Sequence, residues 1–449
     1  MKTIEKQRSI NSRLIQITWP IFVEFVLLML LGSMDILMLG NYSDNAVAAV
    51  GIVNQIINML NLLFQIITAG TGIICAQYIG AKTKRENILK LSGTSLTVNL
   101  IIGFICSIVM YFASTFLLNC MNTAPELMEY SKSYIEIVGG FIIIEAIGMT
   151  FSAILRSFGY TKVCMIITLI MNVYNVISNY ALIYGNFNMP KLGVTGAAIS
   201  TTVSRIIGAI LLGIYLFKVV LKDFKLKYIY KISKEELKKI LKIGAPSAGE
   251  SIAYNIAKLM CTLILTYISV DALTVNSYIN TIAMYIYAFS VSIGQGTAIL
   301  VGQLVGEKRK EDAYKLCFSS LKKAMAISIV VAIIVVLLGR NILELFTDSE
   351  SVINLALAVL LVNGFLEPGR TFNVVVINCL RAAGDVRFPV YIGVCSMWLI
   401  GVGLSYLLSI TFGMGMVGMW IALALDEWLR GIIMCFRWKS KVWYNKALV

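Results

Sequence analysis

The stretch AGTGIICAQYIG, at positions 69–80, recurs at positions 295–306 as QGTAILVGQLVG, with Gly, Gln and Gly at matching places. Each match lies at a numbering offset of 226, and more pairs of identical residues share this offset. They are Pro20 and Pro246, Glu24 and Glu250, and Ala46 and Ala272. The Leu-Arg dipeptides at 155–156 and 380–381 follow at an offset of 225. Because the matches keep one order along the chain, we interpret it as two similar halves.

The composition of the chain indicates that its solvent is lipid. Hydrophobic residues make up 58% and charged residues only 14% of the 449 positions, and the mean hydropathy is +0.83. A soluble domain carries charge on about a quarter of its residues. Apolar runs long enough to cross a bilayer recur near 14–39, 47–76, 88–115, 128–153, 161–185, 193–219, 241–267, 273–302, 315–339, 352–378, 387–411 and 415–437.

These runs predict an all-α polytopic membrane protein with twelve transmembrane helices in two six-helix lobes. Six is an even number, so both halves start on the same side of the membrane and are related by a pseudo-two-fold axis along its normal. We assign 1–219 to an N-lobe, 220–240 to a cytoplasmic linker and 241–449 to a C-lobe. The capping-box pattern from Ser233 to Glu236 predicts a short amphipathic helix in this linker.

The basic residues test the span count through the positive-inside rule. Of the 38 Lys and Arg residues, 31 fall in alternate loops and at the termini on one side, and three fall on the other side. This distribution predicts cytoplasmic termini in the cell's inner membrane. It also accounts for the net charge of +14, because the basic residues mark the cytoplasmic loops and contact the lipid bilayer. We therefore expect no nucleic-acid partner.

Several kinds of chemistry have no support in the sequence. The chain contains no histidine, and its nine cysteines are scattered without a C-x-x-C pair. Metal clusters, His-dependent catalysis and redox sites are therefore not expected, nor is a cofactor. We predict a protein that is not an enzyme, whose proton chemistry depends on carboxylates.

Carboxylates inside apolar runs are candidates for function, because a charge at bilayer depth costs at least about 2.5 kcal/mol. Asp35 and Glu24 are eleven positions apart and lie on one helical stripe, although Asp35 could also lie at an exposed helix end. Glu145 stands alone in the fourth run, so we expect its partner on another helix. Asp426 and Glu427, close to Arg430, have the spacing of an intrahelical ion pair.

Polar side chains also form a stripe along the second span. Facing lipid would be costly for this stripe, so it faces either a central substrate cavity or a seam between helices. The eighth span adds an Asn, a Met and a Tyr that suit organic cations or ordinary packing alike. These substrate-cavity candidates are Asn54, Asn58, Asn61, Gln65, Asn280, Met284 and Tyr287, with Thr68 at the end of the stripe.

The ordered set of motifs resembles the multidrug and toxin extrusion (MATE) family over nearly the whole chain. The residues that carry this resemblance are Pro20, Glu24, Asp35, Ala69-Gly-Thr-Gly72, Gln77, Gly80, Leu155-Arg156-x-x-Gly159, Asn175-x-x-x-Asn179 and Gly193-x-x-Gly-Ala-Ala-Ile-Ser-Thr201. The resemblance implies a bacterial NorM-like or DinF-like member of the MOP flippase superfamily.

The resemblance also implies a cation-coupling site in the N-lobe, formed by Asp35, Asn175, Asn179 and Thr201. An aspartate is usual at the position of Asn179 in several subfamilies, and its loss weakens a two-acid sodium cage. In the C-lobe the resemblance implies a coupling role for Glu250, for which an ion pair with Lys258 through a shared water is the alternative. Glu24, Glu145 and Glu367 are secondary candidates, and Glu367 could instead form a salt bridge with Arg370.

The predicted function is secondary active efflux by rocking of two lobes. Amphipathic or cationic drugs or toxins would leave the cell in exchange for H+ or Na+, and we expect a monomer. The alternative is a flippase for lipid-linked precursors or polysaccharides in the same superfamily. Few basic residues near the core, namely Arg205, Lys258 and Arg370, disfavour that alternative.

Overall fold

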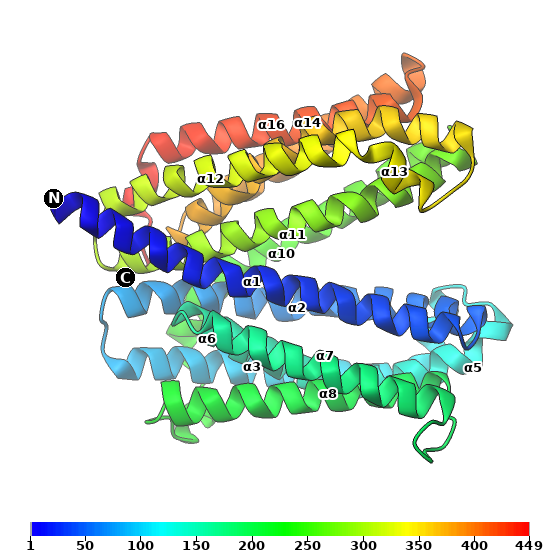
Figure 1. Cartoon of the computed structure of the whole chain (residues 1–449). Helices are drawn as coiled ribbons and strands as arrows, with labels where there is room; N and C mark the ends of the chain where they lie inside the picture. Colours follow the sequence, from blue (N-terminus) through cyan, green and yellow to red (C-terminus); the bar gives the residue numbers. More distant parts are fainter. Residues whose placement is uncertain (1, 449) are drawn as a thin grey trace. The chain divides into compact units, whose positions relative to one another are not determined.

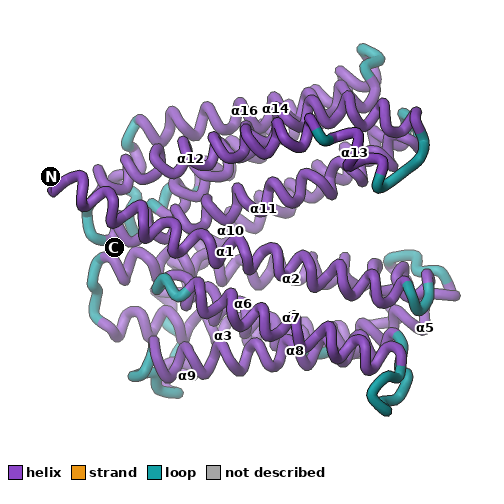
Figure 2. The backbone as a smooth tube through the Cα atoms, viewed as in Figure 1, coloured by secondary structure: helices purple, strands orange, loops and turns teal. Residues whose placement is uncertain are grey.

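The computed structural model describes residues 2–448 and the side chains from Ile10 to Leu448. Within this range the chain forms helices joined by loops, with no strand (Figure 2). The helices expected from the sequence are present as twelve helical segments, labelled in Figure 1 where there is room. The MATE-like twelve-helix interpretation of the sequence therefore agrees with the fold.

The twelve segments use the following elements. The first half contains α1 (Lys2–Gly40), α2 (Asp44–Gly80), α3 (Arg85–Phe112), the bent segment α5 (Pro125–Tyr134), η1 (Ile135–Gly139) and α6 (Ile142–Ser157), α7 (Thr161–Tyr184), and α8 (Val194–Tyr215) with η2 (Leu216–Val220). The second half contains α10 (Lys234–Thr266), α11 (Val270–Gly306), α12 (Lys310–Leu337), α14 (Glu350–Ala382), α15 (Arg387–Ser396) with η3 (Met397–Leu404) and η4 (Leu407–Thr411), and α16 (Gly415–Lys439). Short helices α4 (Ser114–Cys120), α9 (Lys227–Tyr230), α13 (Gly339–Glu344) and η5 (Val442–Asn445) lie between or after them.

Length and apolar composition alone select nine of these helices as membrane spans in the described range, and ten with the bent segment counted. The other two, α10 and α16, contain charged side chains in mid-helix, among them Glu250 and Lys258 in α10 and Asp426 to Arg430 in α16. Charged residues lower the hydropathy of a helix, but the helix can still cross the membrane when the charges are paired inside the protein.

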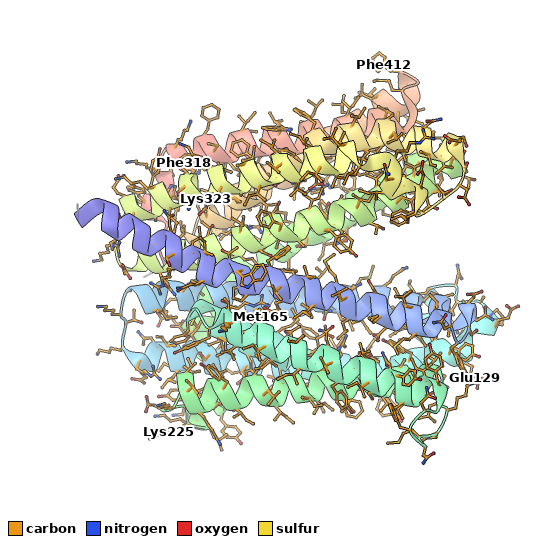
Figure 3. All side chains as sticks on the ribbon, in the orientation of Figure 1. Glu129, Met165, Lys225, Phe318, Lys323 and Phe412 are labelled. Atoms are coloured by element: carbon orange, nitrogen blue, oxygen red, sulfur yellow. The ribbon has the colours of Figure 1, made fainter. Side chains whose placement is uncertain are left out.

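The chain divides into two compact units. The N-unit consists of Val23–Ile79 and Thr83–Ala245, and the C-unit consists of Met1–Phe22, Gly80–Lys82 and Pro246–Val449. Each unit has its own apolar core: α2, α3 and the bent segment supply much of the first, and α11, α14 and α16 much of the second. In Figure 3, Lys225 and Glu129 label opposite ends of the N-unit helices.

The boundaries of the units fall beside the two helix prolines, Pro20 in α1 and Pro246 in α10. Close contacts at glycines explain why the first part of α1 groups with the C-unit and the first part of α10 with the N-unit. A Cβ on Gly244 of α10 would lie 1.7 Å from the Ile66 carbonyl oxygen, and a Cβ on Gly296 of α11 would lie 2.4 Å from Thr18 Oγ1. Small residues thus allow close helix packing at equivalent places in both units.

The linker differs from the expected short, separate helix. Helix α10 runs without a break from Lys234 to Thr266, so the residues after Ser233 form the first turns of the seventh span. The Ser233 hydroxyl accepts a hydrogen bond from the Glu236 backbone N–H at 3.4 Å. The capping box therefore starts the transmembrane helix itself, because nothing between Glu236 and Pro246 ends it.

The fourth span is bent rather than continuous. Helices α5 and α6 meet at 45°, and the π-helix η1 and Gly140 lie at the bend. A Cβ on Gly140 would lie 2.2 Å from the Glu136 carbonyl oxygen, so only glycine fits this turn. Helix breaks of this kind commonly occur at π-bulges and glycines. The bend fixes the direction in which α6 and its Glu145 run.

Candidate cation-coupling site

Asp35 lies inside the N-unit and not at an exposed helix end. Its side chain is on α1, shortly before the helix ends at Gly40, and only 7% of the residue is exposed. Met34 and Ile36, its neighbours in sequence, are exposed. Asp35 is thus the polar position on this turn that faces the protein interior, as the helical stripe shared with Glu24 predicted.

Four predicted residues from three helices, Asp35 among them, form one hydrogen-bonded cluster. Asn179 on α7 donates a hydrogen bond from Nδ2 to Asp35 Oδ1 at 2.5 Å, and Thr201 on α8 donates to Asp35 Oδ2 at 3.4 Å. Asn175 lies one turn before Asn179, accepts from its Nδ2 at 3.1 Å and donates to Thr201 Oγ1 at 3.4 Å. We call Asp35, Asn175, Asn179 and Thr201 the Asp35 cage.

Helix packing brings the cage together. Helices α7 and α8 form an antiparallel hairpin, and a Cβ on Gly196 of α8 would lie 2.5 Å from the Leu182 carbonyl oxygen of α7. This close approach places Asn175 and Asn179, both fully buried, next to Thr201. Tyr134 of α5 is also buried and lies beside Thr201 and Asp35. The cage is therefore closed by protein on several sides.

An ion pair lies next to the cage. Arg205, one turn after Thr201 on α8, contacts Glu145 of α6 with Nη1 and Oε2 2.7 Å apart. Asn61 of α2 donates to the other Glu145 oxygen at 3.0 Å. The partner of Glu145 is thus on another helix, as expected. From the sequence, Arg205 was identified only as a basic residue within a span, and its spacing of four from Thr201 is the signal that could have placed it here.

Glu250 has a different partner from the one that the sequence suggested. Arg381 Nη2 lies 2.5 Å from Glu250 Oε2, so the direct partner of Glu250 is Arg381 and not Lys258. Glu24 forms the equivalent pair in the N-unit, with Arg156 Nη2 2.7 Å from its Oε1. The two glutamates share the numbering offset of 226 and the two arginines the offset of 225. The repeat therefore places the same buried ion pair in each unit.

The C-unit contains a larger charged network between α14 and α16. Arg370 donates to Glu367 at 2.6 Å, so the predicted salt bridge forms, and its Nε lies 3.6 Å from Glu427. Arg430 contacts Asp426 at 2.6 Å and Glu427 at 3.1 Å. The pairing of Asp426 and Glu427 with Arg430 agrees with the sequence interpretation, and Arg370 extends it to the neighbouring helix.

The substrate-cavity candidates do not form one site within a unit. On α2, Asn58 and Gln65 are exposed and Asn54 is half-buried. Asn61 donates its hydrogen bond to Glu145. On α11, Asn280 donates to its own helix at Asn276 O, and Met284 and Tyr287 are exposed. Arg370 lies over the Tyr287 ring, 5.7 Å from its centre. These side chains remain candidates for substrate contact.

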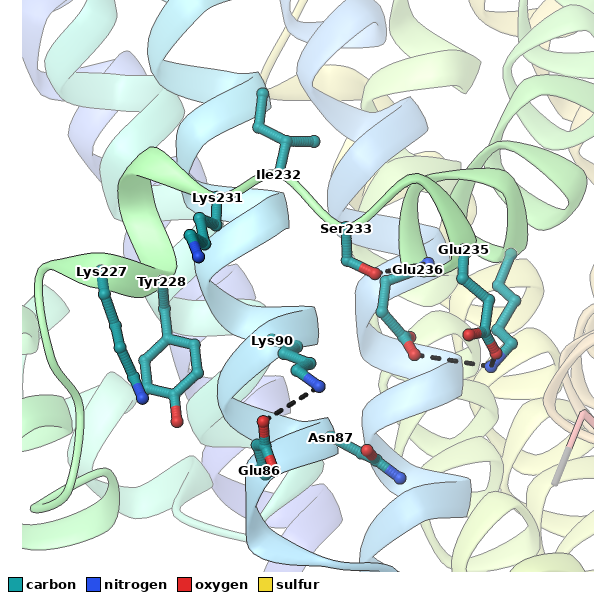
Figure 4. Close-up of a pocket in the computed structure, with 11 residues that line it drawn as sticks. Glu86, Asn87, Lys90, Lys227, Tyr228, Lys231, Ile232, Ser233, Glu235 and Glu236 are labelled. Carbon is teal, nitrogen blue, oxygen red and sulfur yellow. Dashed lines mark hydrogen bonds and ion pairs between the residues drawn. The ribbon is translucent and has the colours of Figure 1, made fainter.

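A polar pocket of about 530 Å³ lies between α3 and the linker (Figure 4). Its acids are already paired, since Lys90 contacts Glu86 at 3.0 Å and Lys239 contacts Glu235 at 2.7 Å and Glu236 at 3.4 Å. These pairs each lie within one helix; the contact across elements is made by Tyr78 of α2, which donates to Glu236 at 2.9 Å. The pocket lining contains none of the predicted site residues.

Comparison with known proteins identifies the family. The family model MatE matches residues 20–181 and again residues 246–407. The chain belongs to the MATE family. Both the starts and the ends of the two matches differ by the same numbering offset as the sequence repeat, so the family model and the repeat divide the chain alike. The protein is therefore a multi-pass membrane transporter rather than an enzyme.

Relatives of this MATE transporter cover nearly its whole length. The uncharacterized transporter YisQ of Bacillus subtilis is 42% identical over 97% of this chain and 95% of its own. The probable multidrug resistance protein NorM of Thermotoga maritima is 27% identical over 99% of this chain and 96% of its own. A solved MOP superfamily transporter from Pyrococcus furiosus is 21% identical, with a TM-score of 0.86 over 96% of this chain and 95% of its own. That likeness shows the fold alone.

Proposed function

We propose that this MATE transporter exports amphipathic, often cationic, organic compounds across the cytoplasmic membrane in exchange for H+ or Na+. Relatives named as probable multidrug resistance proteins support this substrate class. The two-halved fold supports transport by rocking of two lobes around a central path. The excess of basic residues in alternate loops supports cytoplasmic termini.

One observation carries the choice of coupling site. Among the predicted intramembrane carboxylates, Asp35 has only neutral hydrogen-bond donors in direct contact within the described structure. The others each lie within ion-pair distance of an arginine; they are Glu24, Glu145, Glu250, Glu367, Asp426 and Glu427. A paired carboxylate that takes up a proton leaves a buried arginine uncompensated, which is strongly unfavourable. Asp35 can change its charge without that penalty.

The cycle that we infer uses this change of charge. With Asp35 ionised, the outward-open transporter holds its substrate, and arrival of the cation neutralises the carboxylate and weakens its hold on Asn179 and Thr201. The altered packing of α1 against α7 and α8 releases the substrate outward. Return to the inward-open state frees the cation to the cytoplasm. Such coupling requires that the cation binds the two states with different affinities.

A coupling role for Glu250 stays a prediction that its contacts do not favour, because Glu250 and Glu24 form equivalent pairs. A flippase for lipid-linked precursors also gains no support from the contacts. Two of the three basic candidates for meeting an anionic substrate, Arg205 and Arg370, each already contact a glutamate.

The test is ethidium efflux in everted vesicles, driven separately by a pH gradient and by a Na+ gradient. Asp35→Asn should lower the rate under the productive gradient by at least about ten-fold, as expected when a coupling free energy is lost. Ser33→Ala is the matched control, because Ser33 is exposed on the same helix and bonds only to its own Met29 carbonyl oxygen. Equal efflux by Asp35→Asn and wild type under either gradient would show that coupling lies elsewhere.

A further inference from the structure

We propose that the polar pocket between α3 and the linker binds the headgroup phosphate of an anionic phospholipid. Its volume of about 530 Å³ is in the range of sites that take small-molecule ligands. The residues that line it all belong to the N-unit, and they lie between the end of the sixth predicted span and the start of the seventh. Lipid headgroups surround a membrane protein at the ends of its spans, so a lipid can reach this pocket.

The charges that line the pocket leave a surplus of positive charge. Its four lysines and three acids are Lys90, Lys227, Lys231 and Lys239, and Glu86, Glu235 and Glu236. All three acids belong to the ion pairs of Lys90 and Lys239. Within the described part of the chain, Lys227 and Lys231 form no ion pair. One net positive charge and two amines without an acid partner therefore remain for an anion, and phosphate is a common partner of lysine.

Contacts with α3 fix the backbone that carries these two lysines. Thr97 Oγ1 donates to the Ile229 carbonyl oxygen at 2.8 Å. A Cβ on Gly93 would lie 2.4 Å from the Tyr228 carbonyl oxygen, so the linker packs directly on α3. Lys227 Nζ lies 5.0 Å from the centre of the Tyr228 ring, and Figure 4 shows both side chains on one wall of the pocket. Binding then costs the ordering of side chains but not of the linker.

An apolar edge beside the lysines favours a lipid over a soluble phosphate. Leu226 and Tyr230 are four positions apart at α9, with 68% and 81% of their surfaces exposed. Ile232, which lines the pocket, is also exposed. Exposed apolar side chains next to lysines are typical of elements that lie at the membrane interface. Acyl chains would cover these side chains, whereas inorganic phosphate would leave them in water.

The experiment titrates delipidated full-length transporter in detergent with dioleoyl phosphatidylglycerol, and native mass spectrometry measures the lipid bound. Dioleoyl phosphatidylcholine is the reference, because it has the same acyl chains and no net charge. Wild-type protein should bind phosphatidylglycerol at least about ten-fold more tightly, since each lysine near an anionic headgroup contributes about five-fold. Lys227→Gln/Lys231→Gln should lower the phosphatidylglycerol affinity by about twenty-fold for the same reason and leave phosphatidylcholine binding unchanged.

The matched control is Lys222→Gln/Lys225→Gln, which removes the same charge from two exposed linker lysines outside the pocket lining. It should keep the wild-type affinity. Equal weakening in both double variants would overturn the proposal, because only the overall charge of the linker would then matter. Equal affinity of the wild type for the two lipids would also overturn it. Glycerol 3-phosphate at the same concentration should not displace the lipid, and displacement would make the occupant a soluble phosphate instead.

Discussion

At the scale of single residues, the two equivalent pairs Glu24–Arg156 and Glu250–Arg381 have a measurable consequence. Each glutamate is buried, and each arginine is largely buried. Glu24→Gln and Glu250→Gln should each destabilise the protein by roughly 1–3 kcal/mol, because the arginine keeps its charge and loses its partner. Thermal unfolding in detergent, followed with a thiol-reactive dye, measures this loss.

The comparison of these two variants also decides the role of Glu250. If the pairs are structural, both variants should lower the melting temperature to a similar degree and keep their dependence on the pH gradient. Loss of gradient-driven efflux by Glu250→Gln with unchanged melting temperature would instead make Glu250 a coupling residue. Glu307→Gln, at a partly exposed position that contacts Arg309, is a suitable control.

The sequence could identify the members of the Asp35 cage but not all of its neighbours. Asp35, Asn175, Asn179 and Thr201 were found through family motifs, and they meet within hydrogen-bond distance. The partners of Glu145 and Glu250 could not be deduced, because they lie on helices far apart in sequence. A carboxylate among apolar residues indicates that a partner exists, whereas helix packing decides which arginine it is.

At the scale of secondary-structure elements, the bend in the fourth span directs Glu145 towards Arg205. Gly140→Ala should destabilise the fold by about 1–3 kcal/mol, since the added methyl group would overlap the Glu136 carbonyl group. The variant should also weaken proton-driven ethidium efflux, because α6 would point elsewhere. Thermal unfolding and vesicle efflux on the same preparations provide the two measurements.

Gly148→Ala is the matched control for the bend, since nothing lies within 4 Å of the position of its Cβ in the same helix α6. Alanine there should be neutral or stabilising by about 0.5–1 kcal/mol because alanine is the better helix former. If Gly148→Ala were as damaging as Gly140→Ala, the bend would have no special importance.

The bend and the continuous α10 show what periodicity cannot predict in a membrane protein. Apolar character over 128–153 predicts a span but not whether it is straight, because glycine is common in straight membrane helices too. At this point the packing is close, because a Cβ on Gly139 would lie 2.7 Å from Met110 Cε. In the linker, the capping box correctly marked the helix start, but helix ends depend on stop signals that this linker lacks.

At the scale of the whole molecule, the twelve spans and the two-fold repeat could be predicted because hydropathy, loop charge and the constant offset between matching positions agree. Labelling of cysteines tests the orientation in the membrane. Cys120 is exposed on α4, in a connection predicted to face outward, and Lys225 lies in the linker predicted to face the cytoplasm. A membrane-impermeant maleimide should label Cys120 in intact cells.

The same reagent should label Lys225→Cys, in a Cys120→Ser background, only in everted vesicles. The Cys120→Ser protein without Lys225→Cys shows the residual labelling of the remaining cysteines. Labelling of Lys225→Cys in intact cells would place the linker outside and would contradict the assignment of both termini to the cytoplasm.

The central claim is that substrate and coupling cation compete through Asp35; with H+ as that cation, proton release on substrate binding tests it most directly. Ethidium is added to purified transporter in weakly buffered detergent solution, and a pH-sensitive dye reports protons released per ethidium bound. The account predicts proton release by wild-type protein and none by Asp35→Asn, although that variant still binds ethidium. Equal proton release by both proteins would contradict it.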